Sequence, residues 1–164
     1  MNSDEELFRL AVQVGEHLSS TGCHLVSAES CTGGWVGKVL TDVPGSSAWY
    51  LGGAVVYSNL LKQSLLQVNE TTLSAHGAVS EAVVREMACG ALQHLGGQVA
   101  VAVSGIAGPG GEQPGKPVGT VWFAWASRRG QAVDCNARLK LITGDREAVR
   151  RRAVAAALSG VLSL

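Results

Sequence analysis

A hydroxyl, a thiol and paired glycines lie together in residues 28–35, whose sequence is Ala-Glu-Ser-Cys-Thr-Gly-Gly-Trp. A short apolar strand precedes this stretch and an amphipathic helix follows it, so its polar residues occupy a strand-to-helix turn. Such a turn lies at the carboxyl edge of a sheet, where open α/β sheets bind ligands. The first amides of the helix are unpaired donors at the positive end of its dipole. The turn could therefore combine a nucleophile, Ser30, with amides that stabilise an anion.

A serine hydroxyl is a weak nucleophile that needs a base, and Lys62 is the first candidate for that base. It follows Tyr57 and lies on a predicted helix that is apolar at Leu60, Leu61, Leu65 and Leu66. A desolvated lysine loses its charge more readily and can accept a proton. Composition alone favours a solvated surface lysine instead. Tyr57 could supply a hydroxyl, although a tyrosine at a strand end usually packs its ring and leaves its tip in water. His76 is the only histidine in a predicted loop, and a local role at a helix end before Gly77 is favoured for it.

Cys31 is an alternative nucleophile, because a helix N-terminus lowers the pKa of a thiol. A free cysteine is more often a small buried residue, and no histidine partner is evident, so we rank Ser30 above Cys31. The sequence has neither a Cys-x-x-Cys pair nor a metal-ligand spacing of cysteines and histidines. We therefore expect no metal and no other cofactor.

A second glycine-rich segment, residues 104–111, has the sequence Ser-Gly-Ile-Ala-Gly-Pro-Gly-Gly and leaves a continuous apolar run typical of a buried strand. Its glycines would let backbone amides approach an anion. It matches neither the Walker nor the Rossmann pattern, and a purely structural turn fits the segment equally well. Arg146 opens the last predicted helix and could hold a phosphate or carboxylate with two hydrogen bonds, or pair with an acid on the surface.

Hydrophobic periodicity and turn residues predict the elements that must position these groups. A first helix begins at a capping box formed by Ser3 and Glu6 and ends at Gly22. The strands are predicted over 24–28, 50–57, 99–103, 120–127 and 132–141, and the further helices over 32–41, 59–66, 71–76, from 80 to the Gly-Gly pair at 96, and 145–162. Helices between buried strands, followed by a hairpin, predict an α/β fold: a single three-layer α/β/α domain over residues 1–164 with a mixed, mostly parallel sheet.

The charges of the chain balance, with 13 basic and 13 acidic side chains. This balance offers no basic surface for nucleic acid, and the one basic cluster, at 150–152, is too short for a nucleic-acid-binding tail. No apolar run approaches the roughly 20 residues that span a bilayer, and residues 1–10 do not resemble a signal peptide. We expect a cytoplasmic protein with reduced thiols whose partner is a small polar metabolite, with no nucleic acid and no membrane.

Six motifs, in the same order, resemble those of the CinA C-terminal domain family. They are Ala-Glu-Ser-Cys-Thr-Gly-Gly at 28–34, Tyr-Ser-Asn at 57–59, His-Gly-Ala-Val-Ser-Glu at 76–81, Ser-Gly-Ile-Ala-Gly-Pro at 104–109, Lys-Pro-Val-Gly-Thr at 116–120 and Gly-Asp-Arg at 144–146. Stand-alone members of this family, of the PncC type, act as nicotinamide mononucleotide amidohydrolases. One departure is Ile106, because many members carry threonine there.

The resemblance implies hydrolysis of the carboxamide of nicotinamide mononucleotide to nicotinate mononucleotide and ammonia, in pyridine-nucleotide salvage and without a metal. It implies that Ser30 is the nucleophile and Lys62 its general base, with Tyr57 close by. The substrate-binding residues implied are Cys31, Thr32, Gly33, Gly34, Ser104, Gly105, Ile106, Gly108 and Arg146. The alternative is a non-catalytic nucleotide-binding or regulatory module of the same fold. The four tryptophans fit either a core or the interface of a homo-oligomer.

Overall fold

Among residues 3–164, which the computed structural model describes, five strands form one sheet in the order β2-β1-β3-β4-β5. The strands are β1 (Leu25–Glu29), β2 (Tyr50–Val55), β3 (Val99–Gly105), β4 (Thr120–Arg129) and β5 (Ala132–Leu141). β1 pairs in parallel with β2 and β3, whereas the β3–β4 and β4–β5 pairs are antiparallel. The prediction of a mixed sheet is confirmed, but the expectation that it is mostly parallel is wrong. The long glycine-rich connection after β3 turns the chain back, so β4 runs antiparallel to β3 as well as to β5.

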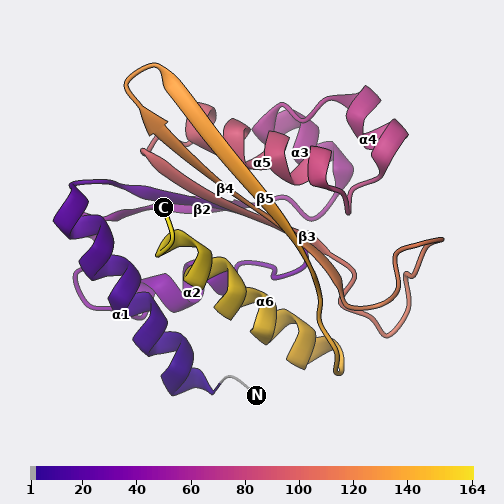
Figure 1. The fold of residues 1–164 in the computed structure, drawn as a ribbon, viewed down its shortest axis with the longest axis horizontal. Coiled ribbons are helices and arrows are strands. Elements are labelled where there is room, and N and C mark those ends of the chain that lie inside the picture. Colours follow the sequence, from indigo (N-terminus) through magenta and orange to yellow (C-terminus); the bar gives the residue numbers. More distant parts are fainter. Residues whose placement is uncertain (1–2) are drawn as a thin grey trace.

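Helices cover both faces of this sheet (Figure 1). One face carries α1 (Asp4–Thr21), α2 (Trp35–Thr41) and α6 (Arg146–Val161), and the other carries α3 (Asn59–Leu66), α4 (Glu70–His76) and α5 (Glu81–His94). Each face has its own buried cluster, with Phe123 and Leu158 in the first and Val84 and Met87 in the second. β3 is buried along nearly its whole length, as expected for a strand covered on both faces. The predicted three-layer α/β/α architecture is confirmed.

The ends of α1 form as the sequence predicts. The Ser3 hydroxyl accepts a hydrogen bond from the Glu6 amide at 3.1 Å, and the Glu6 carboxylate accepts one from the Ser3 amide at 2.7 Å. These bonds satisfy donors that have no partner inside the helix. The helix ends at Gly22, whose φ of 65° is a left-handed conformation that glycine adopts without strain.

The second predicted helix starts later than expected. It was predicted over 32–41 but begins at Trp35, because Gly33 and Gly34, with φ of 62° and 93°, turn the chain before it. β1 extends to Glu29, one residue beyond the predicted end. A 3-10 helix, η1 (Ser46–Ala48), then leads into β2. The residues between β1 and α2 therefore form a separate turn rather than the first turn of the helix.

β1 lies between β2 and β3, and the three parallel strands end at the same edge of the sheet. The chain leaves β1 for β2 on one side and returns to β3 on the other side, which makes this edge a topological switch point. Ligands of open α/β sheets bind at such points. Two hydrogen bonds extend the pairing past the strand ends, from the Ser30 amide to Val103 O at 3.0 Å and from the Val56 amide to Glu29 O at 2.8 Å. Ser30 is therefore held directly at the switch point.

Candidate active site

Lys62 is a fully buried side chain, only 1% exposed. It lies on α3, whose first turn is capped by the Ser58 hydroxyl. Its Nζ lies 3.2 Å from Ser30 Oγ, 2.9 Å from Val56 O and 3.1 Å from Tyr57 O. Burial lowers the pKa of Lys62 from 10.5 to about 8. The alternative of a solvated surface lysine is wrong.

The three partners of Lys62 Nζ suit both of its protonation states. A protonated amine has three N–H groups, which match Ser30 Oγ and the two carbonyls. A neutral amine keeps two N–H groups for the carbonyls of Val56 and Tyr57, and its lone pair then faces the Ser30 hydroxyl. The geometry therefore allows Lys62 to take a proton from Ser30 and return it without losing either carbonyl.

Glu29 organises the turn that carries Ser30. This carboxylate is 2% exposed and accepts four hydrogen bonds, from Thr32 Oγ1 at 2.7 Å, the Gly34 and Val36 amides at 3.0 Å, and the Gly37 amide at 2.8 Å. A carboxylate suits the positive end of a helix. The helix-end amides that the sequence analysis offered to a ligand are thus bound by the protein's own side chain.

Two amides of the turn remain unpaired. The Gly33 amide donates to Ser30 O at 3.1 Å and the Gly34 amide to Glu29. The amides of Cys31 and Thr32, the two that directly follow Ser30, donate to no other residue within residues 3–164, although the Cys31 amide lies against the thiol of its own residue. Both residues are buried, and buried amides without a partner are rare in folded proteins. These two donors are the ones that could stabilise an oxyanion at Ser30.

The Cys31 thiol lies 6% exposed in the core between the sheet and α1, α2 and α6. Burial raises the pKa of this thiol to about 12, because an ionised sulfur would be desolvated there. The proposed lowering by the helix N-terminus is not observed, and Glu29 already occupies that end of the helix. The side chain of Cys31 is a small packing residue, and its contribution to the turn lies in its backbone.

A pocket of about 200 Å³ opens at Cys31, the residue after Ser30, and brings together several predicted residues. It is lined by Cys31, Tyr57, Arg146 and the glycine-rich segment, namely Gly105, Ile106, Ala107, Gly108, Gly110 and Gly111. The Ile106 amide donates to Thr120 O at 2.9 Å, so it continues the β3–β4 pairing rather than facing a ligand. Its side chain gives the pocket an apolar wall where threonine would give a hydroxyl.

Three predicted residues use their polar groups within the protein. The Ser104 hydroxyl is buried and donates to Ala78 O at 2.8 Å. Arg146 Nη1 donates to Gly108 O at 2.6 Å, while the residue as a whole is exposed. Tyr57 is 63% exposed, and its contact with Lys62 is made by its carbonyl rather than by its hydroxyl.

Arg150 is a residue of the site that the sequence analysis missed. From α6 it reaches the turn after β1, with Nε 3.0 Å from Cys31 O and Nη2 2.9 Å from Thr32 O. Its guanidinium lies 5.4 Å from the centre of the Trp35 ring. The cluster of three arginines, noted only for its charge, was the available signal, but nothing in the sequence indicates which of the three faces the turn.

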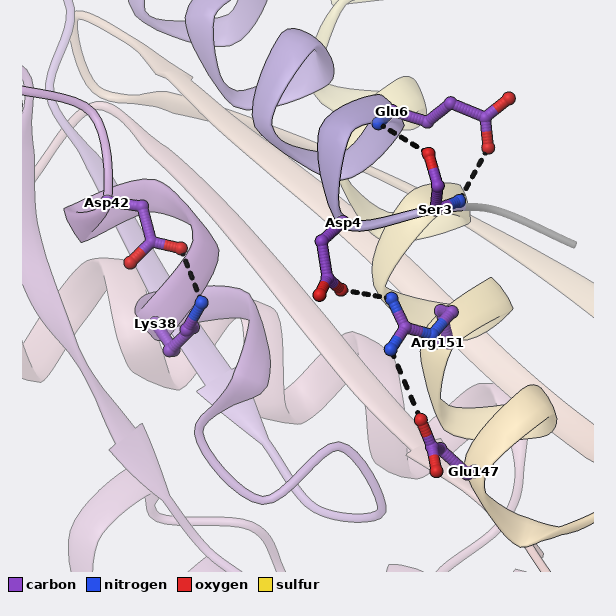
Figure 2. A network of polar contacts seen from close by, with 7 residues as sticks. All are labelled: Ser3, Asp4, Glu6, Lys38, Asp42, Glu147 and Arg151. Carbon is purple, nitrogen blue, oxygen red and sulfur yellow. Dashed lines mark hydrogen bonds and ion pairs between the residues drawn. The ribbon is translucent and has the colours of Figure 1, made fainter.

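The other two arginines of the cluster make their hydrogen bonds away from the turn. Arg151 bonds to Asp4 and Glu147, and Figure 2 shows it between α1 and α6, across from the Lys38–Asp42 pair of α2. Arg152 donates to the carbonyl of Thr143. The Arg151 guanidinium also lies over the Trp35 ring, 4.9 Å from its centre, so Arg150 and Arg151 share that contact.

His76 has the local role that was favoured for it. It is the last residue of α4, Gly77 follows it, and its carbonyl accepts a hydrogen bond from Lys116 Nζ at 2.7 Å. In the described part of the chain no three His, Cys, Asp or Glu side chains are grouped so that they could hold a metal ion. Within the same residues no helix is long and apolar enough to cross a membrane.

Comparison with known proteins places this chain in a family. Residues 7–164 match the model of the CinA C-terminal domain. A protein of Escherichia coli K12 named nicotinamide-nucleotide amidohydrolase PncC is 54% identical over 156 residues, 95% of this chain and 93% of the relative. A Pseudomonas putida protein of the same name is 49% identical, with 94% of each chain covered. The crystal structure of competence damage-inducible protein A from Klebsiella pneumoniae is 41% identical, with a TM-score of 0.90 over 96% of this chain and 95% of that one. The chain belongs to the CinA C-terminal domain family.

Proposed function

We propose that this protein hydrolyses the carboxamide of nicotinamide mononucleotide to nicotinate mononucleotide and ammonia, with Ser30 as nucleophile and Lys62 as general base. It is an amidohydrolase by its kinship with relatives of that name, which are about half identical to it over nearly the whole chain. The observation that carries the mechanism is the 3.2 Å contact between Lys62 Nζ and Ser30 Oγ, made by a lysine whose pKa burial has lowered to about 8.

The first half of the reaction forms an acyl-enzyme. Ser30 Oγ attacks the carboxamide carbon while neutral Lys62 takes the hydroxyl proton. The carbonyl oxygen becomes an oxyanion that the amides of Cys31 and Thr32 stabilise, and one such donor contributes about 2.7–4 kcal/mol in measured cases. Protonated Lys62 then gives its proton to the amide nitrogen, the C–N bond breaks, and ammonia leaves. An ester between Ser30 and the nicotinoyl group remains.

The second half hydrolyses this ester with the same groups. Lys62, neutral again, takes a proton from a water molecule, whose oxygen attacks the ester carbon. The oxyanion forms once more at the two amides and collapses, and the proton returns from Lys62 to Ser30 Oγ. Nicotinate mononucleotide is released, and both side chains are restored to their starting states.

The pocket beside Ser30 accommodates the rest of the substrate. Arg146 uses one guanidinium nitrogen on Gly108 O and keeps its other N–H groups for the substrate phosphate. The amides of Gly108, Gly110 and Gly111 donate to no acceptor within residues 3–164 and can add to that contact. We place the reaction in pyridine-nucleotide salvage in the cytoplasm, where the four free cysteines would stay reduced.

A regulatory module that only binds nucleotide would have no use for the Lys62–Ser30 pair. Burying an amine that is charged in water is unfavourable, and a binding pocket beside Ser30 would function as well with an apolar residue at position 62. The buried lysine therefore favours catalysis over binding alone.

The deciding experiment incubates the purified protein with nicotinamide mononucleotide and measures ammonia and nicotinate mononucleotide together. Ser30→Ala is assayed in parallel, with Ser64→Ala, at an exposed serine on α3, as the matched control. We expect equimolar products from the wild type and from Ser64→Ala, and none from Ser30→Ala. Unchanged turnover in Ser30→Ala would refute the nucleophile, and binding without turnover in the wild type would favour the regulatory module.

A further inference from the structure

The direction of a backbone amide can be fixed through the carbonyl of the residue before it. A peptide unit is planar and trans, so its C=O and N–H groups point in opposite directions. The Cys31 amide shares a peptide unit with Ser30 O, and the Thr32 amide shares one with Cys31 O. Whatever holds these two carbonyls therefore holds the two unpaired amides that follow the nucleophile.

The two carbonyls are held by different parts of the molecule. Ser30 O accepts a hydrogen bond from the Gly33 amide at 3.1 Å, which is a contact within the turn. Cys31 O accepts one from Arg150 Nε at 3.0 Å, and no other donor within residues 3–164 reaches it. The orientation of the Thr32 amide thus depends on a side chain 118 residues further along the chain.

Arg150 is itself kept in one orientation. Its Nη2 donates to Thr32 O at 2.9 Å, so the two bonds come from a planar fork of fixed geometry. Its guanidinium also packs on the Trp35 ring at 5.4 Å. A lysine at this position could place one ammonium near one carbonyl but could not make both bonds in the same geometry.

We infer that Arg150 is a positioning residue that holds the Thr32 amide toward the oxyanion through the carbonyl of Cys31. The inference rests on the proposed function in one respect, namely that an oxyanion forms at Ser30. Arg150 touches neither reacting side chain. Its removal should therefore slow the chemical step without weakening substrate binding or changing the titration of Lys62.

The test measures the reaction of Ser30 with a fluorophosphonate probe, followed by intact mass. This reaction needs the nucleophile and the oxyanion amides but no part of the nucleotide. We expect Arg150→Ala to slow phosphonylation about 10- to 100-fold, below the 10²–10³-fold effect of deleting a donor outright. Arg150→Lys should be slowed nearly as much. Arg152→Ala, at the neighbouring arginine that binds the Thr143 carbonyl, should stay within about 2-fold of the wild type.

Steady-state kinetics with nicotinamide mononucleotide separate positioning from a general loss of structure. Arg150→Ala should lower kcat and leave KM unchanged, and the rise of its rate with pH should keep its midpoint near 8, because Lys62 is untouched. Added methylguanidine should restore part of the kcat of Arg150→Ala. If Arg150→Ala does not fold, Arg150→Lys with an unchanged melting temperature decides the matter.

The outcomes separate this inference from the proposed function. Equal phosphonylation rates in wild type and both Arg150 variants overturn the inference, whatever happens with the mononucleotide, and so does a wild type that is not phosphonylated at Ser30. A wild type that is phosphonylated but releases no ammonia overturns the proposed function, and a slow Arg150→Ala would still support the inference.

Discussion

Two glycine-rich segments follow parallel strands at the same edge of the sheet, and they are built in opposite ways. In the turn at 30–34, between β1 and α2, Glu29 binds the amides and Arg150 binds the carbonyls. In the loop at 106–119, between β3 and β4, residues 109–115 are all exposed, and the amides of Gly108, Gly110 and Gly111 have no partner within the described chain.

This difference separates two requirements of one reaction. The atoms that react must be held within a fraction of an ångström, and the turn supplies that rigidity through the buried Glu29 and the half-buried Arg150. The groups that bind the substrate should instead have no partner inside the protein, because a donor that already makes an internal hydrogen bond cannot donate to the ligand. Changes in the turn should therefore alter kcat and stability together, whereas changes in the loop should alter substrate binding alone.

The largest effect on kcat should come from replacing Lys62, the proposed general base next to the turn. Lys62→Met should lower kcat about 10³-fold, within the range of general base catalysis. In the wild type the rate should rise as the pH increases through about 8, because only the neutral amine accepts a proton, and the variant should lack this rise. Lys38→Met, at an exposed lysine paired with Asp42 on α2, is the control. If the rate of Lys62→Met still rises as the pH passes 8, the rise is due to the titration of another group.

The same pKa predicts a change in stability. The folded protein releases the Lys62 proton near pH 8, whereas the unfolded chain keeps it to 10.5. Between these values the unfolded state binds more protons, so the free energy of unfolding should increase with pH. Chemical denaturation at several pH values should show this increase in the wild type and its absence in Lys62→Met. The same slope in both would show that Lys62 is not desolvated.

Replacing Glu29, the carboxylate that binds the turn, should have a smaller effect on kcat but should also lower the stability of the fold. Glu29→Gln replaces an acceptor of four hydrogen bonds with an amide whose NH₂ group faces other donors. We expect the free energy of unfolding to fall by about 2–3 kcal/mol, as for bonds to a buried charge, and kcat to fall with it. Glu147→Gln, at an exposed acid on α6, should change stability by less than about 0.5 kcal/mol. Full stability with reduced kcat would mean that Glu29 acts in the chemistry itself.

On the loop side, Arg146→Met should raise KM for nicotinamide mononucleotide about 10-fold, with kcat changed by less than about 3-fold. KM for nicotinamide riboside, which has no phosphate, should not change. Arg138→Met, at an exposed arginine on β5, is the matched control. An equal rise in KM for both substrates would indicate that Arg146 acts through its bond to Gly108 O rather than on the phosphate.

The smallest effect should be Gly110→Ala, because no atom lies within 4 Å of the added Cβ and the backbone needs no glycine. Gly34→Ala makes the same substitution in the turn, where φ is 93°. It should lower the free energy of unfolding by about 1–3 kcal/mol and lower kcat. Thermal unfolding and kinetics of the two variants compare turn and loop directly, and similar losses in both would remove the distinction between them.

Local sequence signals predicted most of the fold. The capping box at Ser3, the hairpin at Gly130 and the continuous apolar run of β3 are short-range patterns, and the structure reproduces them. The direction of β4 was not readable in the same way, because a long glycine-rich connection between strands does not specify whether the chain crosses over or turns back. The wrong expectation of a mostly parallel sheet therefore came from the connection between β3 and β4.

The two side chains proposed to react were easier to anticipate than those that support them. Ser30 stands out because it follows an apolar strand in a turn with paired glycines, and Lys62 because it lies among four leucines of one helix. Glu29 and Arg150 look like ordinary charged residues, and only the tertiary structure shows that both are directed at one turn. A contact between residues 31 and 150 leaves no local pattern in the sequence.

The contact between Arg150 of α6 and the turn also bears on the order in which the active site is completed during synthesis. A ribosome makes the turn before it makes Arg150, so the growing chain carries Ser30 and Lys62 before the guanidinium that completes the turn exists. Domains generally fold as units as they emerge. A chain interrupted before residue 146 would therefore be a poor hydrolase, and activity would report that translation had passed α6.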